Sequence, residues 1–169
     1  MGRSLIEQVE LEGNAVPSLV SHCVSAIEAN GLEDEGLYRK SGSSQQQRQI
    51  IQLFDSGSSF DLSDLDQFND VSAIAGVLKS YLRELPDPLI PYESLSGFVE
   101  LTEKPGALSI ASMRSLLSQL PGPHYETLRR LCMHLRVIHD HNTSTRMTAR
   151  NLGIVFGRAY LFFVMPISR

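Results

Sequence analysis

The sequence has no tryptophan, only two cysteines and no excess of basic residues. Its 15 lysines and arginines are outnumbered by 19 aspartates and glutamates, which gives a formal net charge of -4. A protein that binds nucleic acid or an anionic membrane through its general electrostatic field needs a basic surface, so neither partner is expected. Any positively charged site must therefore be local and built from a few side chains.

Long hydrophobic runs and nucleotide-binding motifs are also missing. The apolar stretch at residues 161–165 is too short to span a bilayer, so membrane insertion is not expected. The pattern Gly-x-x-x-x-Gly-Lys-Ser/Thr is absent, so the chain has no phosphate-binding loop of its own. His139 and His141 flank Asp140, but residues two apart do not share a helix face, and no metal site is expected.

The cysteines and the start of the sequence bear on the cellular compartment of the protein. Cys23 and Cys132 stand among apolar residues at helical spacing, which predicts two buried thiols, not a disulfide or a metal pair. The opening residues lead into Glu7 and Glu10 instead of an apolar run, so the sequence does not start like a signal peptide. Together these features predict a cytoplasmic protein.

Apolar residues recur at helical spacing almost throughout the chain. The pattern predicts helices over residues 17–30, 43–57, 70–84 and 148–156, one around 110–117, and two that begin near Pro91 and Pro123. The helix from Pro123 should bury Tyr125, Leu128, Leu131, Cys132, Leu135 and Ile138 along one side. No strand-like alternation persists, so we expect one all-α helical-bundle domain over residues 1–157, packed by ridges and grooves.

The segment Gly36-Leu37-Tyr38-Arg39-Lys40-Ser41-Gly42 contains an arginine bracketed by glycines. A loop of this kind can hold a guanidinium away from the body of a domain, and the planar fork of donors fits phosphate oxygens. Tyr38 is expected to pack the loop onto the domain. Taken alone, a loop arginine is more often simply solvated.

Two further segments carry polar residues in otherwise apolar helices. In residues 78–89 (LKSYLRELPDPL), Lys79 and Arg83 lie one turn apart on a face away from the apolar stripe. On their own they could form a solvated face. In residues 151–157 (NLGIVFG), Asn151 is a poor helix-interior residue, so it either satisfies a backbone carbonyl or helix end, or it serves a partner.

These three segments, in this order, resemble the Rho GTPase-activating protein (RhoGAP) domain family, from about Leu5 to Gly157. The resemblance implies a helical domain that accelerates GTP hydrolysis by Rho-family small GTPases through an arginine finger inserted in trans. The roles it implies are the catalytic finger for Arg39, partner binding for Lys79, Arg83 and Asn151, and finger-loop support for Gly36, Tyr38 and Gly42. Lys79 and Arg83 are also implied to help hold the finger loop.

The resemblance also implies that the partner is a GTP-bound Rho-family GTPase that itself holds GTP and Mg²⁺. The chain would then need no cofactor, and it would not be an enzyme on its own. An alternative stays open, because some RhoGAP-like folds bind a partner without stimulating hydrolysis. Loss of the finger arginine is the usual sign of such folds, whereas Arg39 is present here.

The end of the sequence departs from the family pattern. Family members usually continue after the Phe-Gly pair with proline, asparagine and leucine, followed by a loop and a final helix. Residues 158–169 read RAYLFFVMPISR instead. We therefore expect the C-terminal helix of the family to be missing or altered, with residues 158–169 forming an atypical end.

Overall fold

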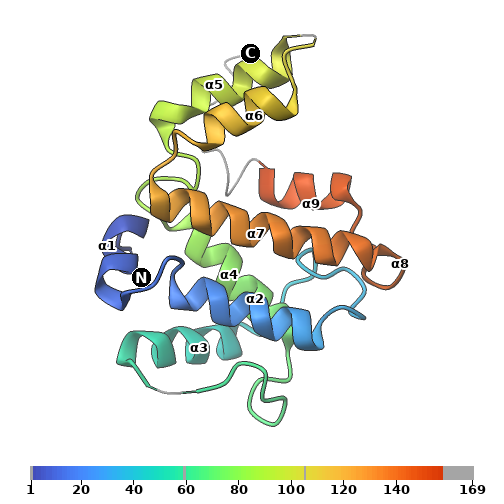
Figure 1. Cartoon of the computed structure of the whole chain (residues 1–169). Helices are drawn as coiled ribbons and strands as arrows, with labels where there is room; N and C mark the ends of the chain where they lie inside the picture. Colours follow the sequence, from blue (N-terminus) through green and yellow to red (C-terminus); the bar gives the residue numbers. More distant parts are fainter. Residues whose placement is uncertain (1, 59, 105, 158–169) are drawn as a thin grey trace, which may run out of the picture.

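The structure is a computed structural model that describes residues 2–58, 60–104 and 106–157 (Figure 1). Within these ranges the regular secondary structure is helical and no strand occurs, which confirms the all-α prediction. The helices are α1 (Leu5–Glu12), α2 (Ser18–Asn30), α3 (Ser44–Ser56), α4 (Val71–Arg83), α5 (Tyr92–Glu103), α6 (Ile110–Leu117), α7 (Gly122–Asp140), α8 (Asn142–Thr145) and α9 (Ala149–Phe156).

Helix α1 was not predicted from the sequence. It begins with a capping box, in which the Ser4 hydroxyl accepts the Glu7 N–H and the Glu7 carboxylate accepts the Ser4 N–H. Leu5 and Val9 are its buried residues. Two apolar positions make too short a stripe to indicate a helix, so the capping pair was the usable signal.

Helices α2, α4 and α7 form the centre of the domain, with α3 below α2 and α9 above α7 in the view of Figure 1. The core-facing side of α4 follows the predicted stripe and includes the fully buried Ile74 and Leu78. Asp70 caps α4 by accepting the Ala73 N–H at 3.0 Å, and the same carboxylate accepts the Ser43 N–H at 2.6 Å. The starts of α3 and α4 are therefore tied together.

In helix α7 the buried residues differ in part from those predicted from the sequence. Tyr125 and Cys132 were expected in its buried stripe, but both are exposed. Each lies one position beyond a buried residue, which turns it about 100° around the helix, away from the core. Polar residues take part in the stripe instead; the buried set is His124, Thr127, Leu128, Leu131, His134 and Ile138. Cys23 is buried as predicted, and both cysteines are free thiols.

The C-terminal helix of the family was expected to be missing or altered, with residues 158–169 in its place. These residues lie outside the described part of the chain, so this expectation stays a prediction. In the part of the chain that is described, no helix is both long enough and apolar enough to cross a membrane. The same residues contain no group of three or more histidine, cysteine, aspartate or glutamate side chains that could hold a metal ion.

Candidate functional site

The loop between α2 and α3 carries Arg39 and folds as a closed turn. The Gly36 carbonyl accepts the N–H groups of Arg39 and Lys40 at 2.8 and 2.9 Å. The Gly36 N–H donates to the Thr145 carbonyl of α8 at 2.7 Å, so the turn is fastened to the body of the domain. Gly36 has a φ of 79°, a left-handed conformation that glycine adopts without strain. The Arg39 side chain is exposed above this fixed backbone.

Tyr38 is the buried neighbour of the exposed Arg39. Its side chain is only 1% exposed, and its ring packs edge-on against Phe156 of α9 with 4.8 Å between the ring centroids. Its φ of 69° is left-handed, which costs a residue with a side chain about 1–2 kcal/mol. The surrounding core must hold this conformation, and it thereby fixes the peptide that leads into Arg39.

Lys79 of α4 contacts that same peptide. Its Nζ donates a 2.6 Å hydrogen bond to the Tyr38 carbonyl oxygen. The Lys79 side chain is half-buried, and this burial, together with the nearby Arg83 charge, lowers the pKa of its amine. Lys79 is therefore a link between α4 and the loop rather than a solvated cation. Arg83, one turn further on, is exposed and donates to the Ser80 hydroxyl at 3.2 Å.

Gly42 lets the end of the loop touch α4. A Cβ atom on Gly42 would lie 2.0 Å from the Ala73 nitrogen and 2.4 Å from the Ser72 carbonyl carbon. These are backbone atoms of α4 that cannot move aside easily, so only glycine allows this approach. The loop that carries Arg39 is thus held at its start by α8 and at its end by α4.

Asn151 lies in the first turn of α9. Its side-chain amide donates to the Arg146 carbonyl at 3.0 Å, and its N–H is capped by the Thr148 hydroxyl at 3.3 Å. Arg146 has a left-handed φ of 58°, so the amide satisfies a carbonyl in the sharp turn between α8 and α9. The contact corresponds to the local role that the sequence left open. Partner binding by Asn151 stays a prediction.

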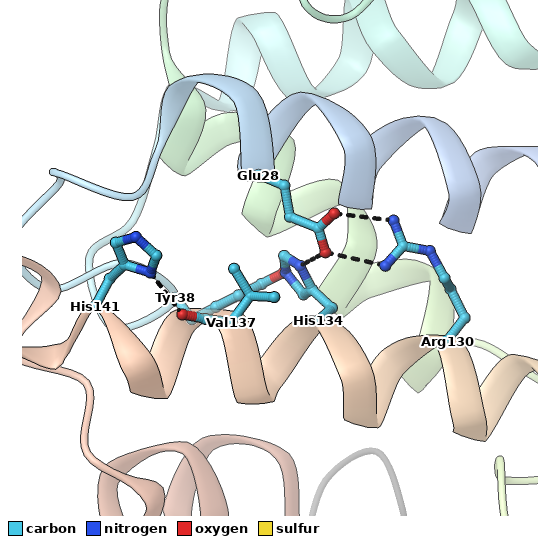
Figure 2. Close-up of polar contacts among 6 residues, drawn as sticks. All are labelled: Glu28, Tyr38, Arg130, His134, Val137 and His141. Atoms are coloured by element: carbon cyan, nitrogen blue, oxygen red, sulfur yellow. Dashed lines mark hydrogen bonds and ion pairs between the residues drawn. The ribbon is translucent and has the colours of Figure 1, made fainter.

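Sequence reasoning missed a polar cluster behind Tyr38, formed by Glu28, Arg130 and His134 (Figure 2). The Tyr38 hydroxyl lies 2.6 Å from Nε2 of His134, and Nδ1 of His134 lies 2.9 Å from the Glu28 carboxylate. Arg130 donates to both oxygens of Glu28, at 2.9 and 3.1 Å. The available signal was the position of His134, which falls on the apolar stripe of α7 between Leu131 and Ile138.

The structure thus assembles an exposed guanidinium on a backbone that is fixed from several sides. Arg39 is exposed on the loop, Lys79 and Gly42 fasten the loop to α4, and Gly36 fastens it to α8. Such an arginine can meet an anion that another molecule presents, without first having to order its own loop.

Known proteins resemble this chain in sequence and in fold. The family model of the RhoGAP domain matches residues 17–162. Rho GTPase-activating protein 27 of Mus musculus is 36% identical over 161 residues, which cover 95% of this chain and 18% of that protein. Beta-chimaerin of Mus musculus is 40% identical over 143 residues, which cover 83% of this chain and 43% of that protein.

The crystal structure of human Rho GTPase activating protein 15 superimposes with a TM-score of 0.88 at 34% identity, covering 95% of this chain and 76% of that chain. The sequence and the fold therefore point to the same group of helical domains. The chain belongs to the RhoGAP domain family. It spans less than half the length of Rho GTPase-activating protein 27 and of beta-chimaerin.

Proposed function

We propose that this chain is a GTPase-activating domain that accelerates GTP hydrolysis by Rho-family small GTPases, with Arg39 as the arginine finger. The observation that carries the proposal is the exposed Arg39 on a loop that the core holds fixed. Membership of the RhoGAP family and relatives named Rho GTPase-activating proteins support it. The chain is then no enzyme on its own, because the reaction takes place on the partner.

The proposed chemistry needs a single exposed arginine and no nucleotide site. Negative charge spreads over the phosphate oxygens in the transition state of GTP hydrolysis, and an arginine supplied in trans increases the rate by about 10³–10⁵. A guanidinium keeps its charge and presents a planar fork of donors to these oxygens. GTP and Mg²⁺ are held by the GTPase, so the chain itself requires no cofactor.

The residues around Arg39 take different parts in this proposal. Gly36, Tyr38 and Gly42 support the finger loop, and Lys79 holds it while contributing to docking. Exposed Arg83 extends the docking surface along α4, and Asn151 completes it on α9. We place this activity in the cytoplasm, because two free thiols fit a reducing compartment.

A phosphate-release assay on a panel of GTP-loaded Rho-family and Ras-family GTPases tests the proposal. With the domain in excess, we expect at least one Rho-family member to hydrolyse GTP about 10³-fold faster or more, and no Ras-family member to respond. Binding to the GTP-loaded Rho-family proteins without any acceleration would contradict the proposal. That result would favour a RhoGAP-like binding module.

A further inference from the structure

We propose that Glu28, Arg130 and His134 are positioning residues that fix the finger loop through the Tyr38 side chain. The inference that these residues order the loop stands on contacts within this chain. Its consequence for the rate of hydrolysis rests on the proposed function of Arg39.

The hydrogen bonds of the cluster have one consistent direction. The Glu28 carboxylate can only accept, so Nδ1 of His134 must carry the proton that lies between them. Nε2 of a neutral His134 then has a lone pair and accepts the O–H of Tyr38. Protons therefore point from Tyr38 to His134 and from His134 to Glu28. A protonated His134 would donate at both nitrogens, so Nε2 could no longer accept the O–H of Tyr38.

Burial keeps the groups in these states. The His134 side chain is 0% exposed, and burial lowers the pKa of its imidazole despite the neighbouring Glu28 carboxylate. Burial likewise raises the pKa values of the Tyr38 hydroxyl and of the nearby Cys23 thiol, so both stay protonated.

Arg130 keeps Glu28 ionised. Burial alone would raise the pKa of the Glu28 carboxyl, but the hydrogen bonds from Arg130 and His134 outweigh it and the pKa lies below its usual value. Figure 2 shows Glu28 reaching from α2 to Arg130 and His134 on α7. The two bonds from Arg130 thus hold the carboxylate in place and in the state that orients His134.

The cluster reaches Arg39 through the backbone. The Tyr38 ring is held at its hydroxyl by His134 and on its side by Phe156. The Tyr38 carbonyl, which begins the peptide bond to Arg39, is held by Lys79. Tyr38 is therefore fixed from α7, α9 and α4 at once, and its left-handed φ of 69° cannot relax without breaking one of these contacts.

Amide hydrogen exchange tests the ordering of the loop. Tyr38→Phe removes the hydroxyl and keeps the ring, and we expect the Arg39 and Lys40 amides to exchange about five- to tenfold faster, because one buried hydrogen bond is lost. Each rate is divided by that of the Leu78 amide in the core of α4, which corrects for global opening. Arg130→Met should act in the same direction, since Glu28 loses the two bonds that Arg130 donates and keeps only its bond to His134.

Arg136→Met is the matched control. Arg136 also lies on α7 and also bonds a carboxylate, Asp140 at 3.0 Å, but this pair is exposed on the surface. It should leave loop exchange unchanged. Unchanged exchange at Arg39 and Lys40 in Tyr38→Phe would overturn the proposal. So would an equal increase at Leu78, because the cluster would then contribute only to global stability.

A double-mutant comparison with Arg39→Ala tests the catalytic consequence. In single-turnover hydrolysis with saturating domain, Tyr38→Phe should lower the rate about three- to tenfold without weakening binding to the GTP-loaded partner. In the Arg39→Ala background it should cause no further loss, because the finger that it positions is gone. The same loss in both backgrounds would overturn the positioning role. If the wild-type domain gives no stimulation, the proposed function fails, and the exchange experiment still decides whether the cluster orders the loop.

Discussion

Replacing Lys79 by methionine should release the finger loop from α4. Methionine keeps much of the side-chain stem but removes the ammonium that donates to the Tyr38 carbonyl at 2.6 Å. A hydrogen bond from a charged group contributes about 1.5–3 kcal/mol. Because the half-buried amine also pays a desolvation cost in the wild type, we expect a net loss of about 1–2 kcal/mol of unfolding free energy.

Thermal unfolding measures this loss. In a domain of this size, 1 kcal/mol shifts the melting temperature by about 2–4 °C, so Lys79→Met should melt about 2–8 °C below the wild type. The stimulated rate of GTP hydrolysis should fall as well, because the peptide that leads into Arg39 loses one of its fixed contacts. Binding to the GTP-loaded partner should weaken by about 1–3 kcal/mol if Lys79 also docks.

Arg83→Met provides the matched control for stability. Arg83 lies on the same helix and is exposed, with a side-chain bond to Ser80 in its own helix. A surface substitution of this kind usually changes stability by less than about 0.5 kcal/mol. Equal melting temperatures for Lys79→Met and Arg83→Met would refute the reasoning that the Lys79 bond fixes the loop.

Three further results are expected. Gly42→Ala should lose about 1–3 kcal/mol in chemical unfolding, because its Cβ would meet the Ala73 nitrogen, whereas Gly153→Ala, with open space around it, should lose nothing. Because burial lowers the pKa of His134, the unfolding free energy should have its full value above a pH of about 6.5 and should fall as the pH drops below that value. A His134→Gln variant whose unfolding free energy, measured by urea titration, falls just as steeply with pH would contradict this. Asn151→Ala should weaken binding of the GTP-loaded partner mildly, and wild-type affinity in a titration would remove it from the docking surface.

The long amphipathic helices were predictable because each carries its own stripe of apolar residues. Helix α4 follows this rule closely, with Ile74 and Leu78 buried. Helix α1 escaped prediction because only Leu5 and Val9 mark its inner face. In α7 the stripe was assigned to apolar residues alone, although a buried polar residue such as His134 can replace one when it finds hydrogen-bond partners.

Part of the candidate site could likewise be predicted from the sequence, and part could not. The Arg39 loop and Lys79 could be identified because their residue pattern lies in short, continuous segments. The cluster behind Tyr38 could not, because Glu28 and Arg130 are 102 positions apart and meet only when α2 packs on α7. The family resemblance implied that Lys79 helps to hold the loop, but the Tyr38 carbonyl could not be named as its acceptor, since a backbone acceptor carries no residue-specific mark in the sequence.

Single-turnover GTP hydrolysis by a Rho-family GTPase, with saturating wild-type or Arg39→Ala domain, tests the central claim most directly. A finger acts on charge that develops in the transition state, so its loss should lower the stimulated rate by about 10² or more and leave affinity for the GTP-bound state nearly unchanged. Arg39→Lys should restore little of the rate, because an ammonium lacks the planar fork of donors. Equal rates with wild type and Arg39→Ala would contradict the account.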